Sequence, residues 1–279
     1  MTPVWLLALA LALQAPLTFK ASTEVVRVDV LVMRGGRPAS GLRLEDFEVR
    51  ENGVRRNVET LGTDANTPID MLLLFDGSAS VRGARQQLLL EAASAAMKGL
   101  RPTDRAGLLL FSHEIRRLTK FTSDWDSVIG ALKASVPSGS TSLGDSLVAA
   151  SLAFDRTEAR RLVFLFTDGA DTSSFLQDYQ VIEALARGNV LVYSFTLDEE
   201  TGGAPGPLLK AATEVTGGRA VTEKNPKKLA AVFREALEEV RARYLLSYTP
   251  DANTAPGWRR LEVKVKGGGR ISARKGYAR

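Results

Sequence analysis

The stretch MLLLFDGSAS, residues 71–80, joins a run of large apolar side chains to a loop of Asp, Gly, Ala and Ser. An apolar run of this kind is typical of a strand that is buried on both faces, as in parallel sheets. Asp76, Ser78 and Ser80 are two positions apart, so an extended loop directs all three side chains the same way. The stretch therefore predicts a central strand with a polar site at its carboxyl end.

Similar apolar runs predict three more buried strands, at residues 106–111, 162–166 and 190–197. Apolar residues at helical spacing predict helices at residues 82–98, 143–154 and 229–240. Strands that alternate with helices predict an α/β fold, in which right-handed crossovers build a doubly wound, mostly parallel sheet flanked by helices.

Both ends of the chain instead combine alternating apolar residues with turn signals. The strands expected there are residues 25–32, 47–50, 54–61, 244–248, 261–265 and 271–275. Each end segment is small for an independent sheet, so we expect the two to pair into one small β-sandwich with the α/β domain inserted between them. The predicted division is a signal peptide at 1–21, an N-terminal β segment at 22–66, a domain at 67–243 and a C-terminal β segment at 244–279.

The composition excludes several kinds of site. The chain of 279 residues is 44% hydrophobic and contains no cysteine and one histidine, His113. A disulfide scaffold, a thiolate zinc site, a cysteine nucleophile and a histidine-rich metal site are therefore excluded. A Ser-His-Asp triad would have to use His113, but no motif places partners for it, so we expect a hairpin-turn or surface role.

The net charge of +5 is concentrated near the end of the sequence. Residues 241–279 contain ten Lys and Arg against two Asp and Glu, a balance of +8 that leaves −3 for the remainder. In residues 261–266 these charges alternate with apolar side chains, which is typical of the solvated face of a strand. We therefore expect no nucleic-acid partner.

Residues 4–13 form an unbroken apolar run rich in Leu and Ala. The run is short for a membrane span, which takes about 20 residues, and suits the apolar core of a secretory signal. Ala10-Leu11-Ala12 fits a small-x-small cleavage site, and cleavage near Ala21 also fits. An uncleaved anchor and a buried N-terminal element remain as alternatives. The leader predicts an exported protein, periplasmic, envelope-associated or secreted, without a stable transmembrane span unless the leader is retained.

Three segments place oxygen-bearing side chains at the borders of predicted elements: residues 76–80, 138–141 and 167–171. The first and third follow predicted strands, and open α/β sheets bind ligands beyond the carboxyl ends of their strands. Two carboxylates and three hydroxyl groups form a set that selects Mg²⁺, or Mn²⁺ and Ca²⁺, over zinc or copper. If an aspartate binds through water, the shell is poor in negative charge and the ion stays open to a carboxylate from outside.

The pattern Asp76-x-Ser78-x-Ser80, then Thr141, then Asp168 after an apolar strand resembles the metal-ion-dependent adhesion site (MIDAS) of von Willebrand factor A domains. The resemblance covers about residues 68–243. It implies that Ser78, Ser80 and Thr141 bind a divalent ion directly or nearly so. It also implies that Asp76 and Asp168 bind the ion directly or through water.

The flanks of this domain resemble bacterial exported "VWFA-related" proteins, at residues 41–53, 244–250 and 274–277. Residues 138–140 read Ser-Gly-Ser where a Gly-Gly pair is commoner before the Thr, which leaves the ligand set intact. The resemblance implies a protein-binding module for adhesion or assembly, not an enzyme. Such a module would use its metal to capture an Asp or Glu of a protein partner.

Three alternatives remain. The first is a Mg²⁺-dependent hydrolase or phosphoryl-transfer enzyme, although phosphatases of that type place a second carboxylate where this chain has Ser78, and no general base is evident. The second is a structural envelope protein with a vestigial metal site. The third is ordinary turn and cap chemistry. Asp145 fits a capping box with Ser142, and Asp171 lies on the third segment, so both are candidates for supporting positions around the metal.

Overall fold

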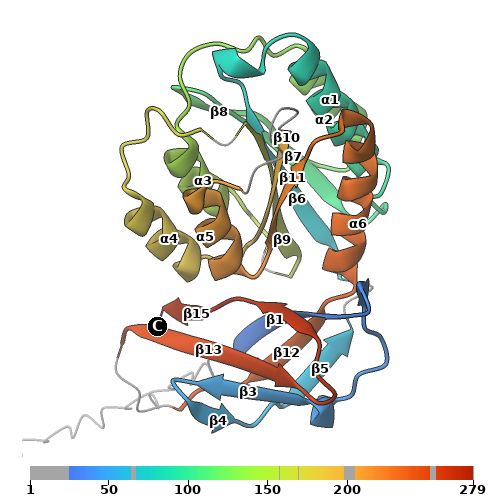
Figure 1. Ribbon diagram of the computed structural model, residues 1–279, viewed down its shortest axis with the longest axis vertical. Coiled ribbons are helices and arrows are strands. Elements are labelled where there is room, and N and C mark those ends of the chain that lie inside the picture. Colours follow the sequence, from blue (N-terminus) through green and yellow to red (C-terminus); the bar gives the residue numbers. More distant parts are fainter. Residues whose placement is uncertain are drawn as a thin grey trace, which may run out of the picture.

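The computed structural model describes residues 25–63, 67–156, 158–168, 170–197, 205–251 and 256–278. The predicted leader at residues 1–21 lies outside these ranges. Figure 1 shows two parts: an α/β part that contains the helices, and a smaller part made of strands that packs against its lower end. Within the described ranges, every helix is too short or too polar to cross a membrane.

A six-stranded sheet is the centre of the α/β part. Its strands are β6 (Ile69–Asp76), β7 (Arg105–Phe111), β8 (Ile115–Thr122), β9 (Arg160–Thr167), β10 (Leu191–Leu197) and β11 (Arg219–Glu223). Their order is β11-β10-β9-β6-β7-β8, and neighbours are parallel except for the antiparallel pair β7 and β8. The predicted mostly parallel sheet is thus confirmed.

Helices cover both faces of this sheet. They are α1 (Ala84–Met97), α2 (Trp125–Lys133), α3 (Leu143–Ser151), α4 (Asp178–Arg187), α5 (Pro207–Thr216) and α6 (Leu229–Arg241). Leu73 and Phe75 of β6 pack in a core with α1, α2 and α6, whereas Leu72 and Leu74 pack in a second core with α3, α4 and α5 (Figure 1). Burial on both faces explains the continuous apolar run of the sequence.

Two further sheets make up the strand part. One contains β1 (Val26–Arg34), β2 (Arg37–Pro38), β5 (Thr60–Thr63), β12 (Tyr244–Tyr248) and β14 (Arg270–Ala273). The other contains β3 (Phe47–Glu51), β4 (Val54–Arg56), β13 (Trp258–Val265) and β15 (Gly276–Ala278).

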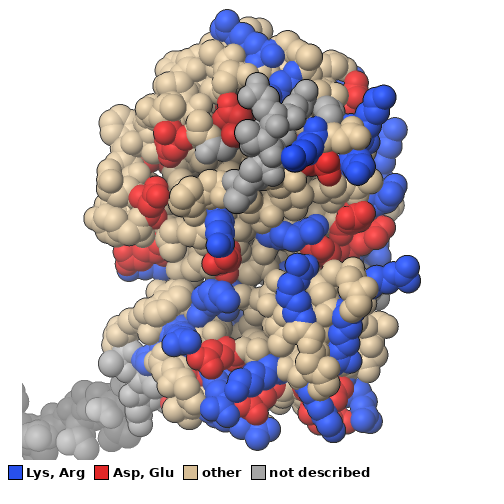
Figure 2. All heavy atoms as spheres, in the orientation of Figure 1, with Lys and Arg blue, Asp and Glu red and all other residues tan. Residues whose placement is uncertain are grey.

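Each of these two sheets combines strands that precede β6 with strands that follow α6. The orders are β14-β1-β12-β5, with β2 on β1, and β15-β13-β3-β4. Val, Leu, Phe and Tyr side chains from both sheets share one core. The predicted β-sandwich with an inserted α/β part is therefore confirmed. Figure 2 shows Lys and Arg side chains over the visible face of the sandwich and at its junction with the α/β part.

Some strands differ from the sequence prediction. Residues 54–61 do not form one stretch, because β4 and β5 join opposite sheets of the sandwich. The strands β8 and β11 are absent from the prediction. β8 is mostly exposed or half-buried and β11 is half-buried throughout. Both lie at the edges of their sheet, where a strand needs no continuous apolar run.

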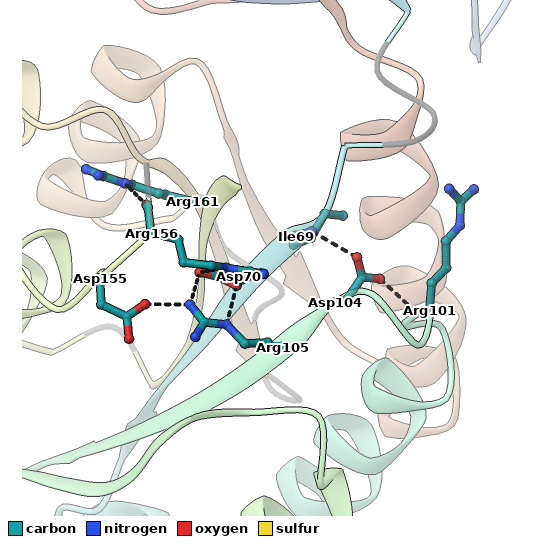
Figure 3. Close-up of polar contacts among 8 residues, drawn as sticks. All are labelled: Ile69, Asp70, Arg101, Asp104, Arg105, Asp155, Arg156 and Arg161. Atoms are coloured by element: carbon teal, nitrogen blue, oxygen red, sulfur yellow. Dashed lines mark hydrogen bonds and ion pairs between the residues drawn. The ribbon is translucent and has the colours of Figure 1, made fainter. Parts of the chain in front are cut away.

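Ion pairs anchor the amino end of β6 (Figure 3). Asp70 is fully buried, and the guanidinium groups of Arg105 and Arg156 both contact its carboxylate. Arg105 donates to the two Asp70 oxygens at 3.0 and 2.6 Å and also pairs with Asp155 at 2.5 Å. Burial raises the pKa of Asp70, but the hydrogen bonds from both arginines outweigh this and hold the pKa below its ordinary value. The protein itself therefore neutralises this buried charge.

Candidate metal centre

The site lies where β6 and β9 end side by side. Phe75 is opposite Phe166 in the parallel register of these strands, so the loops that follow them leave the sheet at adjacent points. β7 lies on the other side of β6, so β6 stands between β7 and β9. The chain connections on the two sides of β6 therefore lead in opposite directions along the sheet. Such a switch point is the usual place for a ligand in an open α/β sheet.

Hydrogen bonds join four of the five predicted ligands. Asp76 is fully buried, and its Oδ1 accepts the backbone N–H of Ser78 at 2.9 Å. The hydroxyl oxygens of Ser78 and Ser80 are 3.0 Å apart, and the Ser80 hydroxyl donates to Oδ2 of Asp168. Side chains from two loops, with Ser80 and Asp168 88 positions apart in sequence, thus lie together.

The second loop brings Thr141 to the same edge through its backbone. Ala79 N–H donates to the carbonyl of Gly139 at 3.0 Å, and Ser138 N–H donates to that of Gly77 at 2.7 Å. Gly139 has φ +80°, and a Cβ there would lie 2.0 Å from Nδ1 of His113. The first and second loops are therefore held together, and the bend before the buried Thr141 requires glycine.

The two candidate supporting residues bind backbone groups. Both Asp145 oxygens accept N–H groups, from Phe175 at 2.9 Å and from Leu176 at 3.0 Å. Asp171 accepts the N–H of Gly144 in the first turn of α3 at 2.9 Å. Together they clamp the third loop to the start of α3, next to the site.

The predicted capping box at Ser142 is wrong. The Ser142 hydroxyl does not cap α3; it donates to the carbonyl of Ser112 at 2.5 Å. Asp171 and Ser174 accept the first N–H groups of the helix in its place. The acceptors come from a loop about 30 residues away, which a local motif cannot indicate.

The electrostatics of Asp76 differ from those of a paired carboxylate. Burial raises the pKa of Asp76, and the negative charge of Asp168 raises it further, while hydrogen bonds from Ser78 and Thr167 act in the opposite direction. Within the described residues, no Lys, Arg or His forms an ion pair with Asp76 or Asp168. A buried carboxylate without a countercharge is unfavourable, so this donor set fits a bound cation.

The ligand chemistry is consistent with a hard ion. No three His, Asp or Glu side chains of the described residues gather in a group that could hold a metal. The candidate set instead combines two carboxylates with three hydroxyl groups, and neutral oxygen ligands of this kind suit Mg²⁺, Mn²⁺ or Ca²⁺.

One contributor to the site was missed from the sequence. The Thr167 hydroxyl donates to Oδ2 of Asp76 at 2.8 Å and so orients that carboxylate from the neighbouring strand. The sequence feature that could have identified Thr167 is its position between the apolar residues of β9 and Asp168. Because threonine is also common inside strands, that place alone did not distinguish it.

Comparisons with known proteins concern the fold of the α/β part. Residues 71–170 match the family model of the von Willebrand factor type A domain. A von Willebrand factor type A protein from Catenulispora acidiphila has a TM-score of 0.55 at 14% identity, covering 93% of this chain and 74% of its own. BatB, a conserved hypothetical protein from Bacteroides thetaiotaomicron, has a TM-score of 0.52 at 15% identity. The match covers 62% of this chain and 98% of BatB.

A third similar structure is that of proximal thread matrix protein 1 from the mussel byssus, described with a zinc-occupied MIDAS motif. Its TM-score is 0.55 at 17% identity, covering 68% of this chain and 49% of its own. No curated protein matches the chain. Residues 71–170 of the α/β part thus match the von Willebrand factor type A domain model, and the α/β part shares its fold with these solved structures.

Proposed function

We propose that this protein is an exported, divalent-metal-dependent binding module that captures an acidic residue of a protein partner. Asp76 carries the proposal, because it is a fully buried carboxylate at the carboxyl edge of the sheet, and the described residues that contact it are neutral donors. A bound cation would remove the unfavourable burial of its charge. The domain type supports a role in protein interaction, and the zinc-occupied MIDAS of the mussel protein supports a role for metal.

In this proposal Ser78, Ser80 and Thr141 supply hydroxyl ligands, and Asp76 and Asp168 supply charge directly or through water. We expect Mg²⁺, with Mn²⁺ or Ca²⁺ as alternatives, because every donor atom is oxygen. When bound, the ion supplies a Lewis-acidic centre for an Asp or Glu carboxylate of the partner. Ser80 is exposed and Asp168 half-buried, whereas Asp76, Ser78 and Thr141 are buried, so the partner would approach from the side of Ser80.

Export belongs to the same proposal and rests on the apolar leader at residues 1–21. The protein would act in the periplasm, at the cell envelope or outside the cell. The division into segments 22–66, 67–243 and 244–279 is also proposed. The middle segment would present the metal centre, and the two outer segments would form its β-sandwich base.

We propose no catalytic role. Ser78 occupies the position at which a phosphatase of the relevant type would place its second carboxylate, and its hydroxyl contacts that of Ser80. A Mg²⁺-dependent hydrolase and a structural protein with a vestigial site are the competing outcomes of the experiment below.

The decisive experiment is capture of a partner from the native envelope fraction by the immobilised full-length protein, in Mg²⁺ and in EDTA. We expect capture in Mg²⁺ only, loss in Asp76→Asn, and full retention in Glu235→Gln, an exposed control on α6. Replacing acidic residues of the captured protein should then abolish binding. Capture that persists in EDTA contradicts the proposal, and phosphate-ester turnover that needs Asp76 would support the hydrolase instead.

A further inference from the structure

A second polar site lies at the junction of the two parts, at the opposite end of β9 from the metal centre. A cavity of about 60 Å³ separates the outer face of the β1 sheet from the amino end of β9 and the segment between α4 and β10. One water needs about 10–15 Å³ of such space, so the cavity has room for a group of about four or five heavy atoms. Its charged lining consists of Arg27, Asp29, Glu158, Arg160, Arg161 and Arg274.

Arg274 is the unusual member of this lining. It is half-buried, and its Nε is buried without a hydrogen-bond partner. No carboxylate of the described residues pairs with its guanidinium, whose contact is with the ring of Tyr277 at 5.3 Å. Burial lowers the pKa of Arg274, and the charges of Tyr248 and Asp29 oppose this. A guanidinium in such a place normally has an anionic partner.

The acidic residues nearby are already engaged or lie at the rim. Asp29 pairs with the buried Arg160 at 2.7 Å, and Glu158 is exposed. Arg27 lies two positions before Asp29 on the outer face of β1, because Val26, Val28 and Val30 face the sandwich core. Four arginines against two carboxylates leave an excess of two positive charges.

The backbone around Arg274 is fixed between the two parts. Ala273 pairs with Val30 of β1, which places Arg274 beside Asp29. Lys275 N–H donates to the carbonyl of Val215 in α5 at 3.3 Å, and a Cβ on Gly217 would lie 2.6 Å from the Arg274 nitrogen. The arginine is therefore presented by a rigid contact between the sandwich and the α/β part.

We propose that this cavity binds a small oxyanion of phosphate size, held by Arg274 and Arg27 from the sandwich and by Arg161 from the α/β part. Planar guanidinium groups match oxyanions through paired N–H donors. Arg161 donates its Nε to the carbonyl of Arg156 at 3.2 Å, and no described residue is seen to accept from its terminal nitrogens. Because the arginines belong to both parts, the bound anion stabilises their relative orientation.

Isothermal titration with sodium phosphate tests this site in the full-length protein, in EDTA so that no metal–phosphate complex forms at the other site. We expect saturable binding of one phosphate per chain. Arg274→Gln should raise the dissociation constant for phosphate at least tenfold, and Arg274→Lys should raise it less. Arg55→Gln, an exposed arginine on β4 with the same charge change, should leave it unaltered. Sulfate and acetate distinguish a tetrahedral oxyanion from a carboxylate.

Thermal melting provides the second readout. Phosphate should raise the melting temperature above that in sodium chloride of equal ionic strength, and Arg274→Gln should abolish the difference. If Arg274→Gln does not fold, Arg27→Gln replaces it, since that side chain is exposed. An absence of saturable binding, or equal binding by the variants and the wild type, would overturn the proposal.

Discussion

Strand β6 has one aspartate, Asp70, next to its first residue and another, Asp76, as its last residue, and both are fully buried. At the amino end, Arg105 and Arg156 neutralise Asp70 and lower its pKa (Figure 3). At the carboxyl end, Ser78 and Thr167 contact Asp76 with neutral donors, and its pKa is raised. Both side chains are inaccessible to solvent, but arginines contact the first carboxylate and neutral donors contact the second.

This contrast separates a structural carboxylate from a binding one. The arginines satisfy Asp70 within the folded chain, which anchors β6 to β7 and to the segment before β9. Asp76 instead is oriented by hydrogen bonds but not neutralised by a described residue. A charge held in place without a countercharge is the condition under which an external cation binds tightly.

The largest expected effect comes from removing the paired carboxylate. Asp70→Asn removes the buried carboxylate that Arg105 and Arg156 share, although Arg105 keeps its contact with Asp155. Breaking a buried ion pair costs about 3 kcal/mol or more. Chemical unfolding should show this loss in the free energy of unfolding. Asp155→Asn is the matched control, because Asp155 is 56% exposed where it pairs with Arg105, and it should cost less than about 1 kcal/mol. Equal losses would break the comparison.

Metal binding should stabilise the protein through Asp76, at the carboxyl end of β6. Mg²⁺ at 100 times its dissociation constant should raise the free energy of unfolding by about 2.7 kcal/mol. The Asp76→Asn variant should show no Mg²⁺ effect, and in EDTA it should be at least as stable as the wild type, because the uncompensated charge is gone. Melting curves in EDTA and in Mg²⁺ measure both effects. A variant that is markedly less stable than wild type in EDTA would contradict this account of Asp76.

The pH dependence of the free energy of unfolding should reflect the lowered pKa of Asp70. Its folded pKa lies below the ordinary value of 3.8, so its contribution to stability is complete above that pH. The contribution is lost as the pH falls through the folded pKa, by about 1.4 kcal/mol for each pH unit that separates the folded pKa from the unfolded one. The difference in unfolding free energy between wild type and Asp70→Asn should therefore shrink from about pH 5 to pH 2 in EDTA. A difference that stays constant would show that Asp70 is not stabilised as an anion.

The smallest effect should come from the second loop. Gly139→Ala places a Cβ at positive φ against His113, and we expect a loss of about 1 kcal/mol. Since Gly139 also accepts the N–H of Ala79, the change should weaken Mg²⁺ binding as well. Gly130→Ala is the control, because a Cβ on Gly130 in α2 meets nothing within 4 Å. Calorimetric titration with Mg²⁺ should distinguish the two variants.

Much of the fold was predictable because its signals are local. The apolar run of β6 requires burial on both faces, and the alternating valines of β1 require a strand with one core face. The Asp and Ser residues after β6 and the Asp after β9 were also recognisable, since a loop that follows a strand points its polar side chains past the sheet. The edge strands β8 and β11 were missed, because half-exposed strands lack such a pattern.

The sequence by itself thus determined the strand–helix alternation, the pairing of its two ends and the residues of the candidate metal centre. Only the tertiary structure decided that β9 adjoins β6, that Thr167 orients Asp76, and that Asp145 and Asp171 clamp the third loop. It also decided that Asp70 is paired with arginines, and that Asp76 and Arg274 have no charged partner among the described residues. The reason is physical: side-chain periodicity depends on neighbouring positions, whereas the neutralisation of a buried charge depends on residues that folding brings from distant parts of the chain.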